Sequence, residues 1–303
     1  MPPMQSLYDI SAPAKLNLFL HITGRRADGY HLLQSVFMLI DWCDTLHFEL
    51  RNDGKITRED LTWALPEDDL SVRAARALQQ ATQCPLGAHI GVAKSVPAQA
   101  GMGGGSSDAA STLLALNRLW KLNLSVEALS RIGLALGADV PFFLGGRNAW
   151  VEGIGEKITP LELPATRLVV VKPEAGLETR QIFSDPTLKR DSETAIISGF
   201  AANTDGRIFN FGRNDLQAVA QKLCSGVTQA LDWLADQGLR GRMTGSGSAV
   251  FAHLLQDSGL DLNLVTPPES LQVRLCSGLE VHPLLGWASS DGKMSQNDGF
   301  SGG

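Results

Sequence analysis

The sequence predicts an α+β fold built in two halves, each with its own strands and helices. Three observations support this prediction. Residues Ala14 to Ile22 alternate in polarity, as a half-buried strand does. Residues Leu70 to Gln83 are rich in Ala, Leu and Arg, which favours a helix. Strand and helix patterns return after residue 160 without any internal repeat, so the second half is not a copy of the first.

The elements of the first half are marked by ordinary start and stop signals. Strands are expected over Asp9 to about Leu50 and Ala88 to Ser95, and helices over Leu70 to Gln83, the apolar segment after Asp108, and Ser125 to Leu136. The acidic run Glu67–Asp69 is typical of a helix start, because carboxylates are favoured at the positive end of the helix dipole. Ser125 is expected to be the N-cap of its helix, and Pro85 is expected to stop the helix over Leu70 to Gln83.

The second half begins after a proline-bounded segment, Pro160 to Pro164. A strand is expected over Arg167 to Lys172, a surface excursion over 184–206, helices over Asn214 to Cys224 and Val227 to Asp236, and a turn and strand within Arg242 to Leu254. We therefore divide the chain into an N-terminal domain at 1–160, a C-terminal domain at 161–288, and a tail at 289–303. The tail has few apolar residues and is expected to be disordered.

Composition excludes several classes of function. The net charge of −6 argues against general nucleic-acid binding, which needs clustered Lys and Arg. No secretory signal is seen at the N-terminus, and no apolar stretch approaches the roughly 20 residues of a membrane helix. The four cysteines are isolated, so neither a disulfide framework nor a structural metal is expected. These features predict a cytoplasmic protein that binds neither nucleic acid nor membrane.

The segment Pro97 to Asp108, PAQAGMGGGSSD, is the most unusual in the chain. Its four glycines, Gly101, Gly103, Gly104 and Gly105, allow the backbone to approach a ligand closely. We expect Ser106, Ser107 and Asp108 to cap the following helix, whose unpaired N–H groups suit a di- or triphosphate. The segment is neither a Walker A motif nor a convincing dinucleotide fingerprint. The alternative reading is a flexible linker or an ordinary helix cap.

Three segments together resemble the GHMP kinase superfamily. They are Ala12 to Leu18 (APAKLNL), the glycine-rich loop, and Met243 to Ala249 (MTGSGSA). The resemblance implies a two-domain fold in which residues 1–160 bind ATP and residues 161–288 bind the substrate. It places the active site in the cleft between the domains and implies ATP with Mg²⁺ as cofactors. It also implies that the loop binds the nucleotide through Pro97, Gly101, Met102, Gly103, Gly104, Gly105, Ser106 and Ser107.

A finer resemblance is to the branch of the superfamily whose substrate alcohol carries a cytidine diphosphate group, in the non-mevalonate isoprenoid pathway. It is carried by Gly24 to His31, GGGSSDAA at the end of the loop, Gly137 to Pro141, Glu152 to Glu156, and Gln181 to Phe183. The similarity covers most of residues 10 to 255. One departure is Ala98–Ala100, which replaces the glycine-rich triplet expected there and bears on nucleotide affinity.

Two residues are predicted to be catalytic. The resemblance makes Asp139, in the turn Gly137 to Pro141, the general base that acts on the substrate hydroxyl. Lys15 lies in an apolar alternating strand, where an ammonium group is costly to bury without a partner, so we predict a Lys15–Asp139 contact. The alternatives are a solvent-facing lysine on an edge strand and an exposed aspartate at a helix end.

The resemblance assigns the substrate site to residues from both halves. Tyr30 and Phe183 would stack on the base, and His31 would hydrogen-bond its edge, since stacking alone tolerates any base. Asn17 completes this site, Thr179 would contact the diphosphate or the erythritol part, and Gly245 and Ser246 would close the site near the phosphates. The alternatives are core packing for the aromatic residues and a plain hairpin turn for the glycine-serine segment.

Two competing functions stay open at this level: another kinase of the superfamily, acting on mevalonate or homoserine, and a nucleotide-binding sensor without chemistry. The presence of both Lys15 and Asp139 argues against the sensor, because a binder needs no base.

The adenine site is expected between about residues 55 and 70, with Trp63 as a candidate. The metal ligands, apart from the Ser106 and Ser107 hydroxyls as candidates, and the oligomeric state cannot be read from the sequence.

Overall fold

The structure is a computed structural model that describes residues 5–201, 207–254 and 266–290. Its strands are β1 (Ser6–Arg25), β2 (His31–Arg51), β3 (Ile56–Asp60), β4 (Gly87–Ala93), β5 (Ala149–Gly153), β6 (Lys157–Pro160), β7 (Arg167–Pro173), β8 (Arg242–Met243), β9 (Val250–Leu254) and β10 (Leu271–Leu279). Its helices are α1 (Leu70–Thr82), α2 (Gly104–Leu119), α3 (Val126–Leu134), α4 (Val140–Gly145), α5 (Thr179–Ser184), α6 (Ile197–Ala201), the 3₁₀ helix η1 (Arg207–Asn210), α7 (Gln217–Leu223) and α8 (Ser225–Asp236). All but the start of the predicted tail lies outside the described residues.

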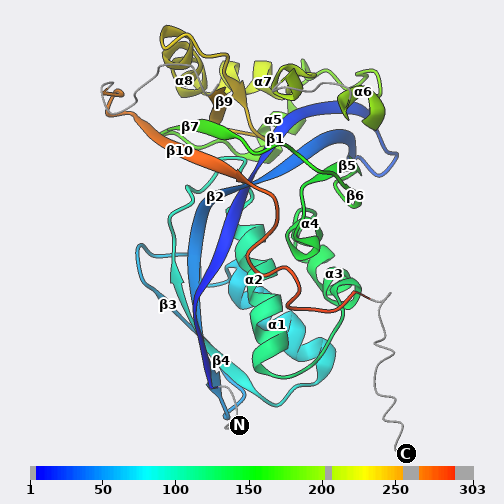
Figure 1. The fold of residues 1–303 in the computed structure, drawn as a ribbon, viewed down its shortest axis with the longest axis vertical. Helices are drawn as coiled ribbons and strands as arrows, with labels where there is room; N and C mark the ends of the chain where they lie inside the picture. Colours follow the sequence, from blue (N-terminus) through cyan, green and yellow to red (C-terminus); the bar gives the residue numbers. More distant parts are fainter. Residues whose placement is uncertain (1–4, 202–206, 255–265, 291–303) are drawn as a thin grey trace, which may run out of the picture.

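The predicted α+β architecture is confirmed, and its strands form a sheet shared by both halves. The main path runs in the order β3-β4-β2-β10-β7-β9-β8, with β1 and β5 paired to β2. The long strands β1 and β2 are antiparallel and extend from the lower to the upper part of the molecule (Figure 1). Strand β10 pairs with β2 at Ile40 and with β7 along its length, so the last strand connects the two halves.

Helices cover the sheet differently at its two ends. In Figure 1, α1 to α4 lie beside the lower part of the sheet, and α7 and α8 lie above β7 and β9. The lower core is built mainly from the first half, whereas an upper core combines Leu20 and Ile22 of β1 with residues of β7, β9, α7 and α8. The division into residues 1–160 and 161–288 stays a prediction, because β1 contributes to both cores.

Two of the predicted helix starts, at the acidic run Glu67–Asp69 and at Ser125, are confirmed. The Asp69 side chain accepts hydrogen bonds from the backbone N–H groups of Ser71 and Val72 at the start of α1. The Ser125 side chain accepts one from Ala128 at the start of α3. Both side chains satisfy donors that a helix start otherwise leaves unpaired.

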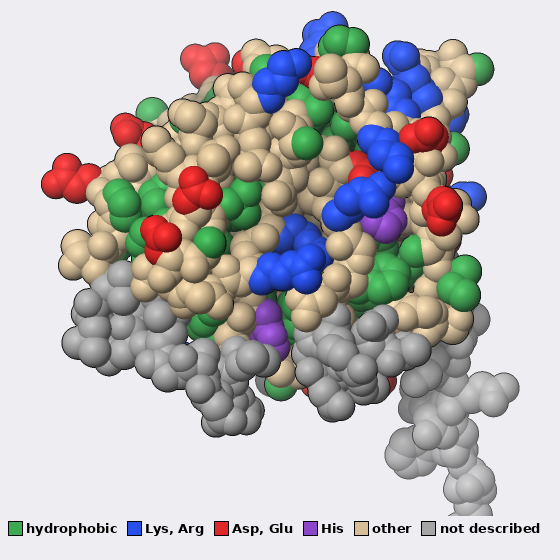
Figure 2. Space-filling model, turned by 90° about the horizontal axis from the view of Figure 1, so that it is seen from above, with side chains coloured by type: hydrophobic (Ala, Val, Ile, Leu, Met, Phe, Trp, Pro, Cys, Tyr) green, Lys and Arg blue, Asp and Glu red, His purple; other side chains and the backbone are tan. Residues whose placement is uncertain are grey.

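The surface of the described part of the chain is mixed in character. Figure 2 views the molecule from above, where basic side chains gather near the middle and to one side with acidic ones among and beyond them. Within the described residues, no helix is both long enough and apolar enough to cross a membrane.

Candidate active site

One cavity of about 730 Å³ is lined by residues from both halves of the chain. The glycine-rich loop meets a second glycine turn, residues Gly245 to Ser248, at this cavity. Gly101 and Gly245 both have positive φ angles, and a Cβ on Gly101 would lie 2.3 Å from the Thr244 carbonyl oxygen. The two turns therefore pack backbone against backbone, an approach that only glycine allows. Segments that are some 140 residues apart in the sequence thus form a single wall.

The glycine-rich loop leads into helix α2, but the helix begins earlier than expected. Gly103, in the left-handed region with φ 72°, is the N-cap residue, and no side chain caps the helix. The prediction that Ser106, Ser107 and Asp108 form the cap is therefore wrong, since all three already lie within α2. Without a side-chain cap, the first N–H groups of this 16-residue helix stay available to an anion.

Lys15 and Asp139 lie together at the cavity, as predicted. The Lys15 Nζ atom is 3.6 Å from Asp139 Oδ2, and it also donates to Asn17 Oδ1. Lys15 is buried, and burial lowers its pKa while Asp139 opposes that shift. The Asp139 side chain remains 30% exposed, so this carboxylate can reach both Lys15 and a ligand.

The position of Lys15 follows from the geometry of β1. Lys15 and Asn17 are two residues apart and therefore point to the same face of the strand. Register shifts against β2 occur on both sides of this pair, and such irregularities redirect side chains. The Asn17 amide nitrogen also donates to Ser35 Oγ at 2.8 Å, which fixes its carbonyl oxygen toward Lys15.

A second lysine, missed by the sequence reasoning, lines the same cavity. Lys94 donates to one carboxylate oxygen of Asp44 and one of Asp108. The other Asp44 oxygen accepts from the backbone N–H groups of Ser95 and Val96. Burial opposes the charge on Lys94, but Asp108 and Asp44 together raise its pKa. Burial raises the pKa of Asp108 above its usual range; Lys94 opposes this shift, and the neighbouring Asp44 carboxylate adds to it.

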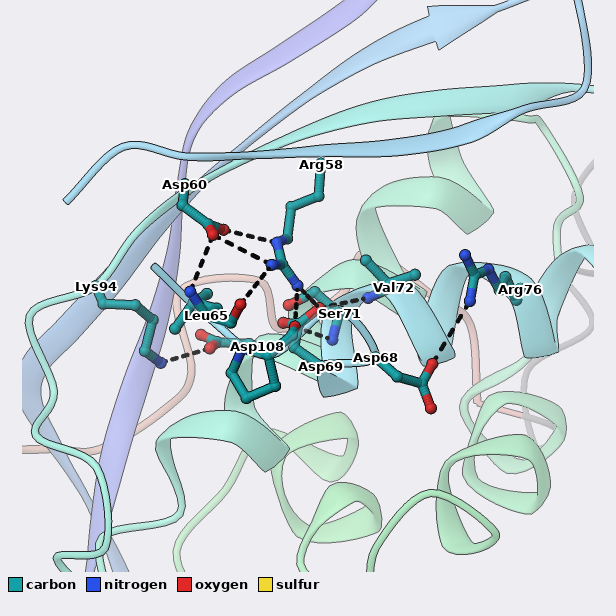
Figure 3. Close-up of polar contacts among 11 residues, drawn as sticks. Arg58, Asp60, Leu65, Asp68, Asp69, Ser71, Val72, Arg76, Lys94 and Asp108 are labelled. Carbon is teal, nitrogen blue, oxygen red and sulfur yellow. Dashed lines mark hydrogen bonds and ion pairs between the residues drawn. The ribbon is translucent and has the colours of Figure 1, made fainter. Parts of the chain in front are cut away.

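The predicted adenine segment, residues 55 to 70, is held by Arg58 (Figure 3). The Arg58 guanidinium donates to Asp60, to Asp69, and to the carbonyl oxygens of Leu65 and Pro66. Leu65, Asp69 and Leu70 line the cavity. Trp63, the candidate stacking residue, is 47% exposed and is absent from the lining. Of this segment, Leu65 and not Trp63 therefore reaches the cavity, and the adenine site stays a prediction.

Thr179 and Ser246 both line the cavity, and their hydroxyl oxygens lie 2.7 Å apart. Phe183 and Arg180, both on α5, line the cavity beside them. Arg180 was not among the predicted site residues. It adds a cationic side chain on this side, and no ion pair of Arg180 is found among the described residues.

Most of the predicted site residues share this cavity. The lining includes Lys15, Asn17, Pro97, Gly101, Met102, Gly103, Gly104, Gly105, Ser106, Asp139, Thr179, Phe183, Gly245 and Ser246. Ser107 is fully buried, and its hydroxyl finds no hydrogen-bond partner among the described residues. Tyr30 and His31 are also outside the lining. Tyr30 is 61% exposed, whereas the His31 ring lies 4.9 Å from the Phe183 ring.

Two protein-family descriptions match separate parts of the chain, and both parts contribute residues to the cavity. The description "GHMP kinases N terminal domain" matches residues 69–147, and "GHMP kinases C terminal" matches residues 198–258. The first range includes the glycine-rich loop and Asp139, and the second includes Gly245 and Ser246.

Relatives and solved structures extend the similarity over nearly the whole chain. A 4-diphosphocytidyl-2-C-methyl-D-erythritol kinase of Albidiferax ferrireducens is 74% identical over 288 residues, which cover 95% of this chain and 98% of the relative. A crystal structure of 4-(cytidine 5'-diphospho)-2C-methyl-D-erythritol kinase matches with a TM-score of 0.72 and 29% identity, covering 90% of this chain and 98% of the other. A homoserine kinase from Cytophaga hutchinsonii shares the fold, with a TM-score of 0.66 and 14% identity, covering 93% of this chain and 97% of that one.

Proposed function

The chain belongs to the GHMP kinase family, and from this premise we propose that it transfers the γ-phosphate of ATP to the 2-hydroxyl of 4-diphosphocytidyl-2-C-methyl-D-erythritol. The protein is a kinase, and this substrate places it in the non-mevalonate route to isoprenoids. The observation that carries the proposal is the pairing of Lys15 with the partly exposed carboxylate of Asp139, in the cavity that the start of α2 also lines.

The cavity supplies the groups that phosphoryl transfer requires. The N–H groups at the start of α2 hold the phosphates of ATP, since a helix N-terminus attracts anions. Asp139 accepts the proton of the substrate hydroxyl while the hydroxyl oxygen bonds to the γ-phosphorus of ATP. The bond between the γ-phosphorus and the oxygen that bridges it to the β-phosphate breaks, which releases ADP. Lys15 holds the Asp139 carboxylate in place and adds positive charge near the moving phosphoryl group.

The substrate lies on the side of the cavity formed by α5 and the second glycine turn. Thr179, Gly245 and Ser246 hold its phosphate-bearing middle, and Asn17 faces the part next to Lys15. Phe183 stacks on the cytosine, and His31, whose ring lies 4.9 Å from the Phe183 ring although it is outside the cavity lining, hydrogen-bonds the edge of the base. Tyr30 is exposed and also lies outside the lining. Arg180, on the same helix, places a cation beside the diphosphate.

A magnesium ion fits the oxygen donors of the cavity. Among the described residues no group of three His, Cys, Asp or Glu side chains forms a metal cage. Mg²⁺ needs no such cage, because in kinases it is bound largely by phosphate oxygens and water. The Ser106 hydroxyl, in the first turn of α2, is the protein donor that would hold it. When bound, the ion neutralises phosphate charge that builds up during transfer.

The test is ADP release, measured with Mg-ATP and each of three acceptors in turn. Turnover with 4-diphosphocytidyl-2-C-methyl-D-erythritol, and none with mevalonate or homoserine, is the expected result. Turnover with mevalonate or homoserine instead would overturn the substrate assignment but keep the kinase chemistry. Tight ATP binding with no turnover of any acceptor would favour a nucleotide sensor.

We also propose that the enzyme is cytoplasmic and acts on a small molecule without binding nucleic acid. The four cysteines are all free thiols, as expected in a reducing compartment. Cell fractionation with an antibody against the protein checks this location.

A further inference from the structure

Arg190 contacts both the His31 ring and the backbone of Phe183, whose ring lies next to that of His31. Its Nε–H group donates to His31 Nε2 at 3.0 Å. Its Nη2 donates to the carbonyl oxygens of Phe183 at 3.1 Å and Asp185 at 2.9 Å, and its Nη1 donates to that of Leu188 at 3.0 Å. One half-buried guanidinium thus holds the His31 ring and the backbone of the segment that carries Phe183.

This contact determines which nitrogen of His31 carries the proton. A guanidinium group has only donors, so the His31 Nε2 atom must accept and must be unprotonated. The ring is then neutral, with its proton on Nδ1. Burial lowers the pKa of His31, and Arg190 and Arg25 lower it further, so the neutral form is favoured. Arg25, the cross-strand partner of His31 in β1, and Arg190 are the charged groups that act on this ring.

We propose that Arg190 is a positioning residue that fixes His31 as the Nδ1–H tautomer, so that the ring offers a hydrogen-bond donor to the pyrimidine. The inference rests on the proposed function, which places cytosine against Phe183 and His31. Cytosine carries an unprotonated N3 acceptor, whereas uracil carries an N–H donor at the same position. A fixed donor at His31 therefore favours cytosine and rejects uracil, which stacking on an aromatic ring cannot do.

Arg190 also restricts Phe183. The carbonyl oxygen of Phe183 accepts from Arg190, and the Phe183 ring lies 4.9 Å from the His31 ring at an angle of 32°. The Arg190 side chain thus sets the tautomer of His31 and the position of Phe183. A substitution at Arg190 is expected to affect the cytidine end of the substrate and to leave ATP binding unaffected.

The test compares Arg190→Met with Lys222→Met as a matched control. Lys222 pairs with the Asp185 side chain at 3.2 Å, so it holds the same segment without touching His31. The first readout is the ring nitrogen signals of His31 in a long-range ¹H–¹⁵N NMR spectrum of the ligand-free protein, assigned by their loss in His31→Gln. With only 6 histidines in the chain, this assignment is practicable. We expect the Nδ1–H pattern in the unaltered protein and in Lys222→Met, and a mixture of tautomers in Arg190→Met.

The second readout is kcat/KM for the cytidyl substrate and for its uridyl analogue. We expect Arg190→Met to lower kcat/KM for the cytidyl substrate roughly 10- to 100-fold, the size of effect that one buried unpaired hydrogen-bonding group produces. The preference for cytidyl over uridyl substrate should fall, and the KM for ATP should stay within about twofold. Lys222→Met should preserve both the preference and the rate.

Two results would overturn the proposal: an unchanged His31 spectrum in Arg190→Met, or a lower rate with the same cytidyl preference, which indicates a purely structural role. Lack of turnover of the cytidyl substrate by the unaltered protein would instead refute the proposed function, and the cytosine-reading part of the inference with it. The NMR measurement decides the tautomer independently, because it needs no substrate.

Discussion

The cavity contains two buried lysines, and they differ in what surrounds them. Lys15 faces one carboxylate, Asp139, which is 30% exposed. Lys94 faces two carboxylates, Asp44 and Asp108, which are almost completely buried. Consecutive glycines of the loop border the two clusters: a Cβ at Gly103 would lie 3.3 Å from Lys15 Cε, and one at Gly104 would lie 3.5 Å from Asp44 Oδ2.

The difference in pKa between the two lysines has a physical cause. Burial lowers the pKa of Lys15 because a single, partly solvated carboxylate only partly compensates for the lost water. At Lys94, which is less deeply buried than Lys15, two carboxylates overcome the burial and raise the pKa. The Lys15 cluster therefore has an open carboxylate that can act on a ligand. The Lys94 cluster uses its carboxylates internally, where they connect β2, the residues after β4, and α2.

The largest expected effect is on catalysis, in Asp139→Asn. Loss of a general base lowers kcat by about 10²- to 10⁴-fold, while ATP binding and folding should be retained because Asp139 is partly exposed. Steady-state kinetics and ATP titration measure the two properties. The same change in the other cluster, Asp108→Asn, is the comparison variant. An equal loss of kcat from Asp108→Asn would remove the distinction between the clusters.

The second effect is on stability, in Lys94→Met. This change leaves Asp44 and Asp108 buried without a cation and should lower the free energy of unfolding by about 3–5 kcal/mol. Lys15→Met should cost less, because its partner Asp139 can be solvated. Urea unfolding of both variants measures the difference. Asp108→Asn should recover part of the loss in the Lys94→Met background, and equal destabilisation by the two lysine variants would contradict this view.

The third effect is on pH dependence. Because the pKa of Lys15 lies below the ordinary value of 10.5, this lysine loses its proton earlier than a free lysine as the pH rises. Hence kcat/KM should fall on the alkaline side below pH 10.5, about tenfold per pH unit beyond that pKa. Lys15→Arg should remove this alkaline limb, since an arginine stays charged. A pH–rate profile that Lys15→Arg leaves unchanged would assign the limb to another group.

The smallest effect is expected at the Thr179–Ser246 hydrogen bond, which involves neither lysine. Thr179→Val keeps the side-chain shape and should raise the KM of the acceptor about two- to tenfold, the net value of one hydrogen bond. Thr187→Val, on the same segment, is the control and should have no effect on KM, because its hydroxyl bonds to the Asp185 side chain within that turn and does not line the cavity. A loss of kcat from Thr179→Val that exceeds the loss from Asp139→Asn would mean that the base lies elsewhere.

The sequence predicted several local features correctly for physical reasons. Asp69 and Ser125 cap helices because a short polar side chain before an apolar periodic segment satisfies unpaired N–H groups. The Lys15–Asp139 contact could be predicted because an ammonium group in an apolar strand requires a partner. The α+β fold and the family also followed from patterns in the chain. The catalytic and binding roles of the site residues stay predictions until the variants are measured.

Other parts of the site could not be read from the sequence. Asp108 was interpreted as a helix cap, but its carboxylate faces Lys94 from within α2. Asp44, Lys94 and Asp108 come from three different segments, and each alone resembles an ordinary surface charge. Trp63 has an aromatic ring that could stack on a base, but the loop that Arg58 holds brings Leu65 to the cavity instead.

By itself, the sequence determined the α+β class, where helices α1 and α3 begin, and which lysine in a strand needs a carboxylate. These depend on neighbours within a few residues, whose polarity and backbone freedom are visible in the chain. Only the tertiary structure decided that Lys94 joins Asp44 and Asp108, and that Arg190 reaches His31 across 159 positions. Such pairs depend on strand register and on helix packing, which bring distant residues together and remove the water that would otherwise separate their charges.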